Sequence, residues 1–214
     1  MVRTQLTRLS ELAVTDRAAV DALLDTARVG HIGLVADGHP LVIPTAIARD
    51  GDSVLVHGST GSRWMRLLAG AAPACLTVTV VDGLVLARSA FESSMHYRSA
   101  VLFGSFSPVQ GDQKLHALEV LVDALLPGRS MEVRPSTGKE LAATMVLALP
   151  IAEWSLKVSD GWPEDAPDDV AGAAWAGVVP LIQRAGTPRP APDLRDGISV
   201  PTSVHSLSNQ QYGC

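Results

Sequence analysis

Short β-rich runs separated by Asp-Gly pairs constrain the fold of this chain more than any other feature. Three such runs follow one another at residues 31–36, 40–48 and 53–57, with Asp37-Gly38 and Asp50-Gly51 between them. Asp-Gly favours the tight turns of β-hairpins because both residues tolerate positive φ angles. The pattern therefore predicts an antiparallel meander in this part of the chain.

The remaining sequence continues the β-rich pattern with only a few helices. We expect further strands at residues 74–81 and 84–89, joined by a turn at Asp82-Gly83, and at 97–109 and 144–152. The spacing of apolar residues predicts helices at about 15–28, 62–69 and 112–126. Six or more strands with helices between only some of them favour an antiparallel barrel over a doubly wound sheet. The predicted fold class is mainly β, a β-barrel with flanking helices.

The composition changes near the C-terminus. Proline and acidic residues dominate positions 163–169, and residues 186–214 are rich in Pro, Ser and Asn without apolar periodicity. We therefore expect one domain at residues 1–185 and a Pro/Ser-rich C-terminal arm or tail at 186–214.

The charge of the chain bears on its partners and its location. The net charge of −5 offers no general attraction to nucleic acid or to anionic lipids. We find neither a secretory leader pattern nor a run of about 18 apolar residues. We therefore expect a cytoplasmic protein that binds neither nucleic acid nor a membrane.

Two polar stretches are the candidate binding segments. The first, His57–Arg63, lies between an expected strand and an expected helix and offers small residues, hydroxyls, backbone N–H groups and one guanidinium. Such a segment can cradle a phosphate, although an ordinary helix-capping turn has the same composition. The second, Arg88–Ser99, connects two apolar runs and is equally consistent with ligand binding and with simple exposure to solvent.

Several segments in this order resemble the FMN-binding branch of the pyridoxamine 5'-phosphate oxidase superfamily that includes nitroimidazole reductases. They are His57–Arg63 (HGSTGSR), Asp82–Phe91 (DGLVLARSAF), Ser94–Gly104 (SMHYRSAVLFG), Ser155–Val158 (SLKV) and Trp175–Pro180 (WAGVVP). The resemblance covers residues 10–185. It implies a six-stranded antiparallel FMN-binding split barrel that forms a homodimer, with cofactor clefts at the interface between the subunits.

The resemblance also implies the residues that bind the flavin. At the ribityl and phosphate end it places His57, Gly58, Ser59, Ser62 and Arg63. Along the ring it places Pro44 and Thr45, with Arg98 and Ser99 approaching from an adjacent strand or across the dimer, and Trp175 covering the ring edge from the partner chain.

The chain departs from the family pattern at two points. Glu92 and Ser93 stand where relatives often have a pair of histidines, and Arg63 is followed by Trp64 where true pyridoxamine phosphate oxidases have a second basic residue. If those histidines serve substrate or haem chemistry in relatives, the first departure argues against that activity here. The second argues against classical oxidation of a phosphorylated vitamer.

The leading functional hypothesis is an FMN-dependent oxidoreductase that passes electrons from a reduced nicotinamide to a small-molecule substrate. The alternative is a non-catalytic protein that binds or stores flavin, haem or the deazaflavin F420 on the same fold. The cofactor carries the electron chemistry, so the sequence identifies no catalytic side chain. No metal site is predicted, because His31 and His39 fit structural or exposed roles and the acidic run 164–169 lacks the ligand spacing of a calcium loop.

Overall fold

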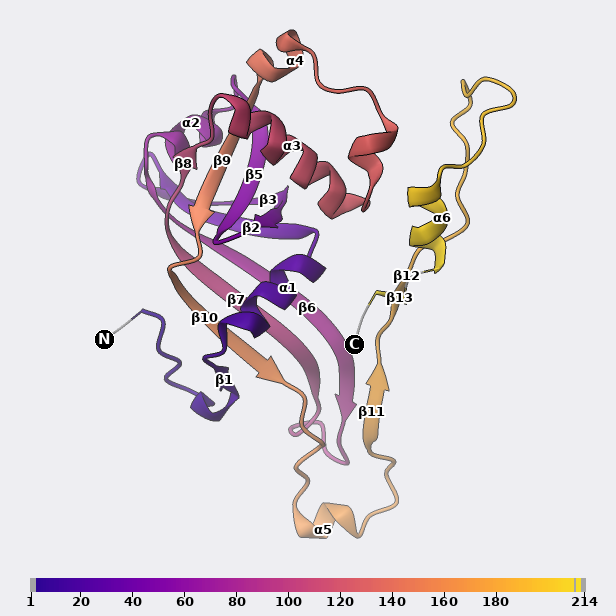
Figure 1. Cartoon of the computed structure of the whole chain (residues 1–214). Coiled ribbons are helices and arrows are strands. Elements are labelled where there is room, and N and C mark those ends of the chain that lie inside the picture. The colour runs from indigo at the N-terminus through magenta and orange to yellow at the C-terminus, as the bar shows by residue number, and fades with distance from the viewer. Residues whose placement is uncertain (1–2, 210, 213–214) are drawn as a thin grey trace.

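The computed structural model describes residues 3–209 and 211–212, and its strands form two main antiparallel sheets (Figure 1). The larger sheet has the strand order β1 (Ala13–Val14), β10 (Glu153–Ser159), β7 (Ser94–Ser105), β6 (Pro73–Leu86), β2 (Val29–Ala36) and β3 (His39–Ala46), with β11 (Gly177–Pro180) paired to β6. The smaller sheet has the order β4 (Ala48–Asp50), β5 (Ser53–Ser59), β9 (Thr144–Pro150) and β8 (Ser107–Pro108). A short pair joins β12 (Gln183–Arg184) to β13 (Gln211–Tyr212).

Helices flank the two sheets. They are η1 (Ser10–Leu12), α1 (Arg17–Thr26), α2 (Arg63–Ala69), α3 (Asp112–Leu125), η2 (Arg129–Glu132), α4 (Gly138–Ala143), α5 (Pro167–Val170) and α6 (Thr202–Asn209). No helix in the described part of the chain combines the length and the apolar character that a membrane crossing requires. The predicted class, a mainly β split barrel with flanking helices, is confirmed.

Both Asp-Gly hairpins at the start of the barrel form as predicted. Asp37 and Gly38 have φ angles of 52° and 78°, which is the left-handed conformation that a tight hairpin turn between β2 and β3 requires. The second turn joins β4 to β5, with Asp50 opposite Ser53 and Gly51 at a φ of 55°. Local turn chemistry therefore fixes the register of both hairpins.

The expected turn at Asp82-Gly83 is wrong, because β6 continues through it as one strand of 14 residues. The pairing of β6 with β7 shifts register between Val81 and Gly83, which marks a β-bulge. Gly83 is buried opposite Pro180 of β11, and a Cβ there would lie 3.1 Å from the carbonyl oxygen of Val179. The glycine thus permits a close strand approach, and the chain turns later, at residues 87–93.

The core of the barrel lies between the two sheets and is closed by α1. Val20, Leu23 and Leu24 of α1 are buried in the same cluster as the strand residues Leu76 and Leu102. Asp16 caps this helix, since its side chain accepts a hydrogen bond of 2.9 Å from the Ala18 backbone N–H. The helix therefore begins where the sequence predicts, although it ends at Thr26 rather than near residue 28.

Strand β5 has two differently covered faces. Val54 and Val56 point into the barrel core, whereas Leu55 belongs to a second cluster with Val146 of β9 and Leu121 of α3. The smaller sheet is therefore packed against the barrel on one face and against α3 on the other (Figure 1). Alternation along the strand places His57 on the α3 side.

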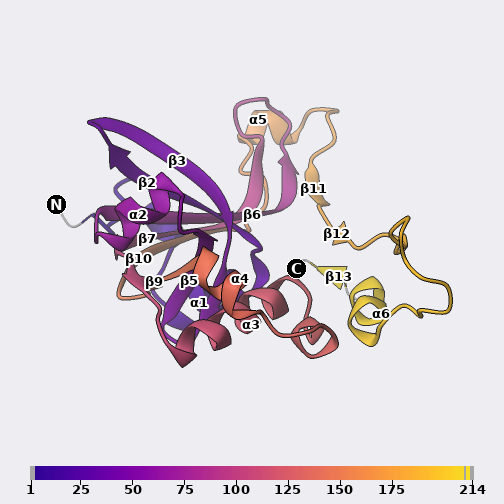
Figure 2. The same cartoon turned by 90° about the horizontal axis from the view of Figure 1, so that it is seen from above.

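The chain beyond β10 forms an arm that reaches past the barrel (Figures 1 and 2). The side chain of Asp165, only 1% exposed, fixes this arm by accepting hydrogen bonds from the backbone and the guanidinium of Arg88, at 2.7 and 2.9 Å. Further along, both the backbone and the hydroxyl of Ser203 in α6 donate to Glu132 of η2. The hydroxyl hydrogen bond is the main cause of a lowered pKa at Glu132. The sequence analysis did not anticipate α6.

Candidate cofactor site

The predicted phosphate turn lies between the end of β5 and the start of α2, as expected. The Ser62 backbone N–H donates to the Ser59 carbonyl at 2.9 Å, and the Gly61 N–H donates to the Ser59 hydroxyl at 3.2 Å. Ser62 is the N-cap residue of α2, but its hydroxyl makes no capping hydrogen bond. The turn therefore leaves the Ser62 hydroxyl and first-turn amides of α2 for a ligand.

Gly58 allows the turn to pack closely against α2. A Cβ at Gly58 would lie 2.9 Å from Cγ of Met65, a side chain that is completely buried. Replacing this glycine would require Met65 to move. The backbone of the turn is therefore seated directly on the barrel core.

Arg63 is at the surface rather than enclosed by the turn. Its guanidinium forms an ion pair with Asp37 in the β2–β3 hairpin turn, and both side chains are more than half exposed. An exposed pair of this kind contributes only about 0–1 kcal/mol. A phosphate oxygen can therefore replace Asp37 as the partner of Arg63 at little cost in free energy. The role of Arg63 in phosphate binding stays a prediction.

Pro44 and Thr45 lie on β3, next to the start of β2. Pro44 is opposite His31 and Thr45 is opposite Gly30. Strand β3 also contacts β5, the strand that ends at the phosphate turn. The contact of Pro44 and Thr45 with a flavin stays a prediction.

Arg98 and Ser99 lie on β7, on the far side of β2 and β6 from Thr45. Three strand spacings separate β3 from β7, which is about 14 Å. Ser99 shares a hydrogen bond of 2.9 Å with the Thr79 hydroxyl, and Arg98 makes two bonds of 2.8 Å to Asp82. These two residues therefore form a separate polar group within one subunit.

Thr79 and Asp82, the hydrogen-bond partners of Ser99 and Arg98, line a cavity of about 650 Å³. It lies between the start of β2, the middle of β6 and residues 181–183. In this stretch β6 no longer pairs with β2, whose pairing reaches as far as Thr77, and does not yet pair with β11, whose last residue Pro180 lies opposite Gly83. The cavity therefore occupies a gap between two edge partners of β6.

Trp175 lies two residues before the start of β11 and is 65% exposed. Its ring packs against Gly177, where a Cβ would lie 2.9 Å from the indole. Figure 1 shows β11 and α2 at opposite ends of the barrel. Within one subunit, Trp175 is therefore remote from the phosphate turn.

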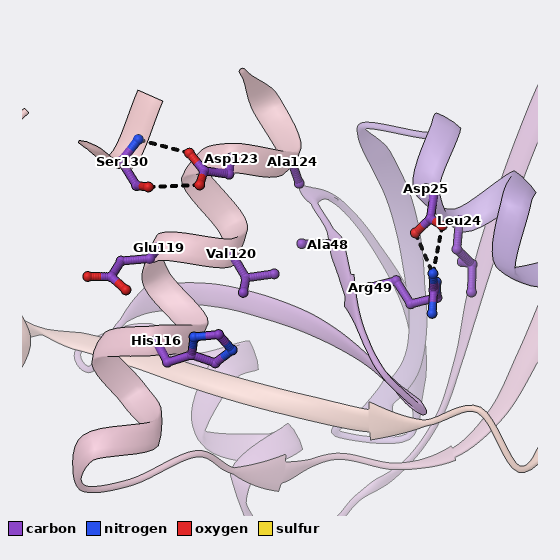
Figure 3. A pocket seen from close by; sticks show the side chains of 10 residues that line it. All are labelled: Leu24, Asp25, Ala48, Arg49, His116, Glu119, Val120, Asp123, Ala124 and Ser130. Carbon is purple, nitrogen blue, oxygen red and sulfur yellow. Dashed lines mark hydrogen bonds and ion pairs between the residues drawn. The ribbon is translucent and has the colours of Figure 1, made fainter. Parts of the chain in front are cut away.

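A charged groove of about 380 Å³ lies between α1, β4 and α3 (Figure 3). Arg49 points across to Asp25, with hydrogen bonds of 2.8 and 2.7 Å. Asp123 accepts from the backbone and the hydroxyl of Ser130 at 2.8 and 2.7 Å. These three charged groups already have partners within the chain, so we assign no ligand to this groove.

A second groove, of about 280 Å³, lies beneath α3 and is mostly apolar. It is lined by His57 of β5, by α3 and by residues 133–136. Arg134 stands at this groove and makes hydrogen bonds of 2.9 and 2.6 Å to Glu140. The pKa of Glu140 is lowered to about 2, mainly by the hydrogen bonds from Arg134. The sequence analysis predicted the helix at residues 112–126 but did not identify this groove.

The two sheets and the closing helix define a split-barrel protein. A family model described as pyridoxamine 5'-phosphate oxidase matches residues 16–158, and the chain belongs to that family. No curated protein sequence matches the chain.

Solved structures extend this similarity to nearly the whole chain. The FAD and haem binding protein from Mycobacterium smegmatis is 50% identical, with a TM-score of 0.89 over 92% of this chain and 97% of that chain. The flavocytochrome Anf3 from Azotobacter vinelandii is 37% identical, with a TM-score of 0.89 over 96% of each chain. A Bacteroides thetaiotaomicron protein named for 5-nitroimidazole antibiotic resistance is 18% identical, with a TM-score of 0.58 over 68% of this chain and 86% of that chain, and shares the fold.

Proposed function

We propose that this protein is a dimeric flavin-binding oxidoreductase that carries haem as a second cofactor. The observation that carries the proposal is the similarity over more than nine-tenths of the chain to two proteins named for a flavin together with haem or a cytochrome. The M. smegmatis protein is named for FAD, so we expect FAD in preference to the FMN that the family resemblance first implied.

We place the phosphate end of the flavin at the turn between β5 and α2. There the Ser59 and Ser62 region offers backbone N–H groups and a hydroxyl, and Arg63 stands beside it in a weak, exchangeable ion pair. Backbone N–H groups and a guanidinium are the donors that phosphate oxygens accept most strongly. Pro44 and Thr45 on the neighbouring strand would then lie along the flavin.

We propose that a second copy of the chain completes the flavin site. Arg63 pairs with Asp37 at one end of the β2–β3 hairpin, whereas the cavity next to Arg98 and Ser99 begins at Val29, at the other end. Seven residue steps along β2 separate these ends, which corresponds to about 23 Å. In a two-fold dimer, Arg98, Ser99 and Trp175 of one subunit can meet the turn of the other.

The outer face of the large sheet supports this assembly. Val29 and Val35 of β2 and Val42 of β3 point away from the barrel core and are each at least half exposed. Trp175 and several apolar residues of the arm are exposed as well. Exposed apolar side chains on one face of a sheet can form an interaction site, and an identical sheet offers a complementary face.

The flavin, when bound, supplies two-electron and one-electron transfer. The chain itself binds the phosphates, orients the ring between strands and excludes water with the apolar outer face. In this proposal the electrons come from a reduced nicotinamide and pass to a small acceptor.

Spectroscopy and chromatography of the purified protein test this proposal. We expect a flavin absorbance band that NADH or NADPH bleaches under anaerobic conditions, and FAD as the flavin released on denaturation. A flavin band that neither nicotinamide bleaches would favour a non-catalytic binding or storage protein. Protein that takes up neither FAD nor FMN would refute the proposal, and a deazaflavin spectrum would point to F420.

A further inference from the structure

We propose that Asp37 determines which flavin this site prefers. Its carboxylate competes with the flavin phosphate for Arg63, and it disfavours the highly charged phosphate of FMN more than the phosphates of FAD. The family resemblance assigns no role to Asp37. This inference rests on the proposed function for the presence of a flavin and for the phosphate role of Arg63, and it adds a residue that selects among flavins.

The β2–β3 hairpin brings Asp37 to the phosphate turn. Asp37 and Arg63 are 26 positions apart, and the Arg63 guanidinium donates to the Asp37 carboxylate within an ion pair. Ala36 and His39 are the last paired residues of the hairpin, so Asp37 and Gly38 form its two-residue turn. The carboxylate therefore lies at the tip of a paired hairpin, beside the first residue of α2.

The backbone of the hairpin, rather than the ion pair, holds Asp37 in place. Eight residue pairs join β2 to β3, and Asp37 and Gly38 have the positive φ angles that a two-residue turn requires. The carboxylate therefore stays near the phosphate turn when Arg63 turns to a ligand. An incoming phosphate meets both a competitor for the guanidinium and a like charge at short range.

Asp37 is the carboxylate that stands out at this turn. Among the described residues, no other acidic side chain forms an ion pair or a hydrogen bond with positions 57–63. Carboxylate and phosphate oxygens accept the same hydrogen bonds from a guanidinium. Asp37 therefore occupies Arg63 as a phosphate oxygen would.

The common flavins differ in the charge that they would place beside Asp37. Riboflavin has no phosphate, whereas FMN ends in a phosphate monoester with a charge of about −1.5 to −2 at pH 7. In FAD each phosphate carries a single charge, and the second phosphate leads away to the adenosine. Repulsion from a fixed carboxylate rises with the charge on the nearest group. Asp37 should therefore weaken FMN binding most, FAD binding less and riboflavin binding not at all.

The exposure of the ion pair limits the size of the effect. Both side chains are more than half exposed, so releasing Arg63 from Asp37 should change phosphate affinity by up to about fivefold. Repulsion adds to this effect, most strongly for FMN, and salt screens it. At low ionic strength we expect Asp37→Asn to tighten FMN binding about tenfold and FAD binding about threefold, with riboflavin binding unchanged.

Asparagine is the appropriate replacement because it keeps the turn. Asn before Gly favours the same two-residue hairpin, so Asp37→Asn removes the charge and preserves the backbone. Asp52→Asn is the matched control, because Asp52 lies in the β4–β5 turn and pairs with Arg17 at 2.8 Å. That turn is at the opposite end of β5 from the phosphate turn. Both variants therefore lose one exposed Asp–Arg pair and one negative charge.

Fluorescence titration of the full-length protein with riboflavin, FMN and FAD tests the assignment. We compare wild type with Asp37→Asn, Asp52→Asn, Arg63→Ala and the double variant Asp37→Asn/Arg63→Ala. Without Arg63 there is no competition, so the gain in FMN affinity from Asp37→Asn should shrink to the part that repulsion contributes. Asp37→Gly, which also suits the turn, should change FMN affinity in the same direction as Asp37→Asn.

The opposing outcomes are equally specific. Equal gains for the three flavins, or the same gains in Asp52→Asn, overturn the assignment. Weaker FMN binding by Asp37→Asn also overturns it, because Asp37 would then orient Arg63 instead of competing for it. If wild type binds flavin and Asp37→Asn binds FMN and FAD no differently, this inference is wrong and the proposed function stands. A protein that binds none of the three flavins refutes both.

Discussion

The buried carboxylate of Asp165 gives a sharp test of how the arm is held. Its side chain is 1% exposed and accepts one hydrogen bond from the Arg88 backbone and one from the Arg88 guanidinium. Hydrogen bonds to charged groups contribute about 1.5–3 kcal/mol each. The Arg88 side chain is 28% exposed and regains water when the partner is lost, so we expect a net cost of about 2 kcal/mol for Asp165→Ala.

That cost should appear locally rather than in the unfolding of the barrel. Asp165 lies outside the buried clusters, so once the arm detaches the barrel loses nothing further. Hydrogen exchange should therefore speed up about 30-fold at residues 160–176, which is the factor that 2 kcal/mol represents, with little change in strands β6 and β7. Asp168→Asn, an exposed change in the same segment, is the control. Equal exchange in Asp165→Ala and wild type, or an equal effect from the control, would show that this contact does not hold the arm.

Three other predictions follow from local geometry. Gly83→Ala should lower the free energy of unfolding, measured in urea, by about 1–3 kcal/mol, because the added Cβ lies 3.1 Å from the backbone of β11. Gly138→Ala, with open space around it, should leave this free energy unchanged, and equal effects of the two substitutions would argue against the close approach. Arg63→Ala should weaken flavin binding more than Arg66→Ala in a fluorescence titration, and matching affinities would remove Arg63 from the phosphate site. The Glu140 pKa is lowered to about 2, so its contribution to stability is complete above about pH 4.5 and is lost as the pH falls toward 2; a carboxyl NMR titration midpoint near 4.5 would contradict this.

The sequence analysis recovered features that depend on local chemistry. The Asp37-Gly38 hairpin, the helix after Ser62 and the start of the first helix near residue 16 all formed, because each depends on residues within a few positions of one another. The fold class followed from the number and spacing of such elements. The family resemblance then named the flavin segments, which remain predictions at the level of single residues.

The failures came from long-range contacts. Asp82-Gly83 has the composition of a turn, but β7 and β11 pair across it and keep β6 extended, so Gly83 serves strand approach rather than a positive φ angle. The burial of Asp165 also depends on a partner 77 positions away. The face that His57 presents depends on the register of β5 with β9 and on where α3 docks, and neither can be read from the HGSTGSR motif.

The pairing of β11 with β6 has a consequence for the minimal size of this protein. The family-matching region ends at residue 158, before β11, yet the distal half of β6 relies on β11 for its edge. A chain trimmed to that region would present unsatisfied backbone groups beside the apolar Leu84 and Leu86. Bare apolar edges of this kind recruit other chains, so the trimmed protein should aggregate.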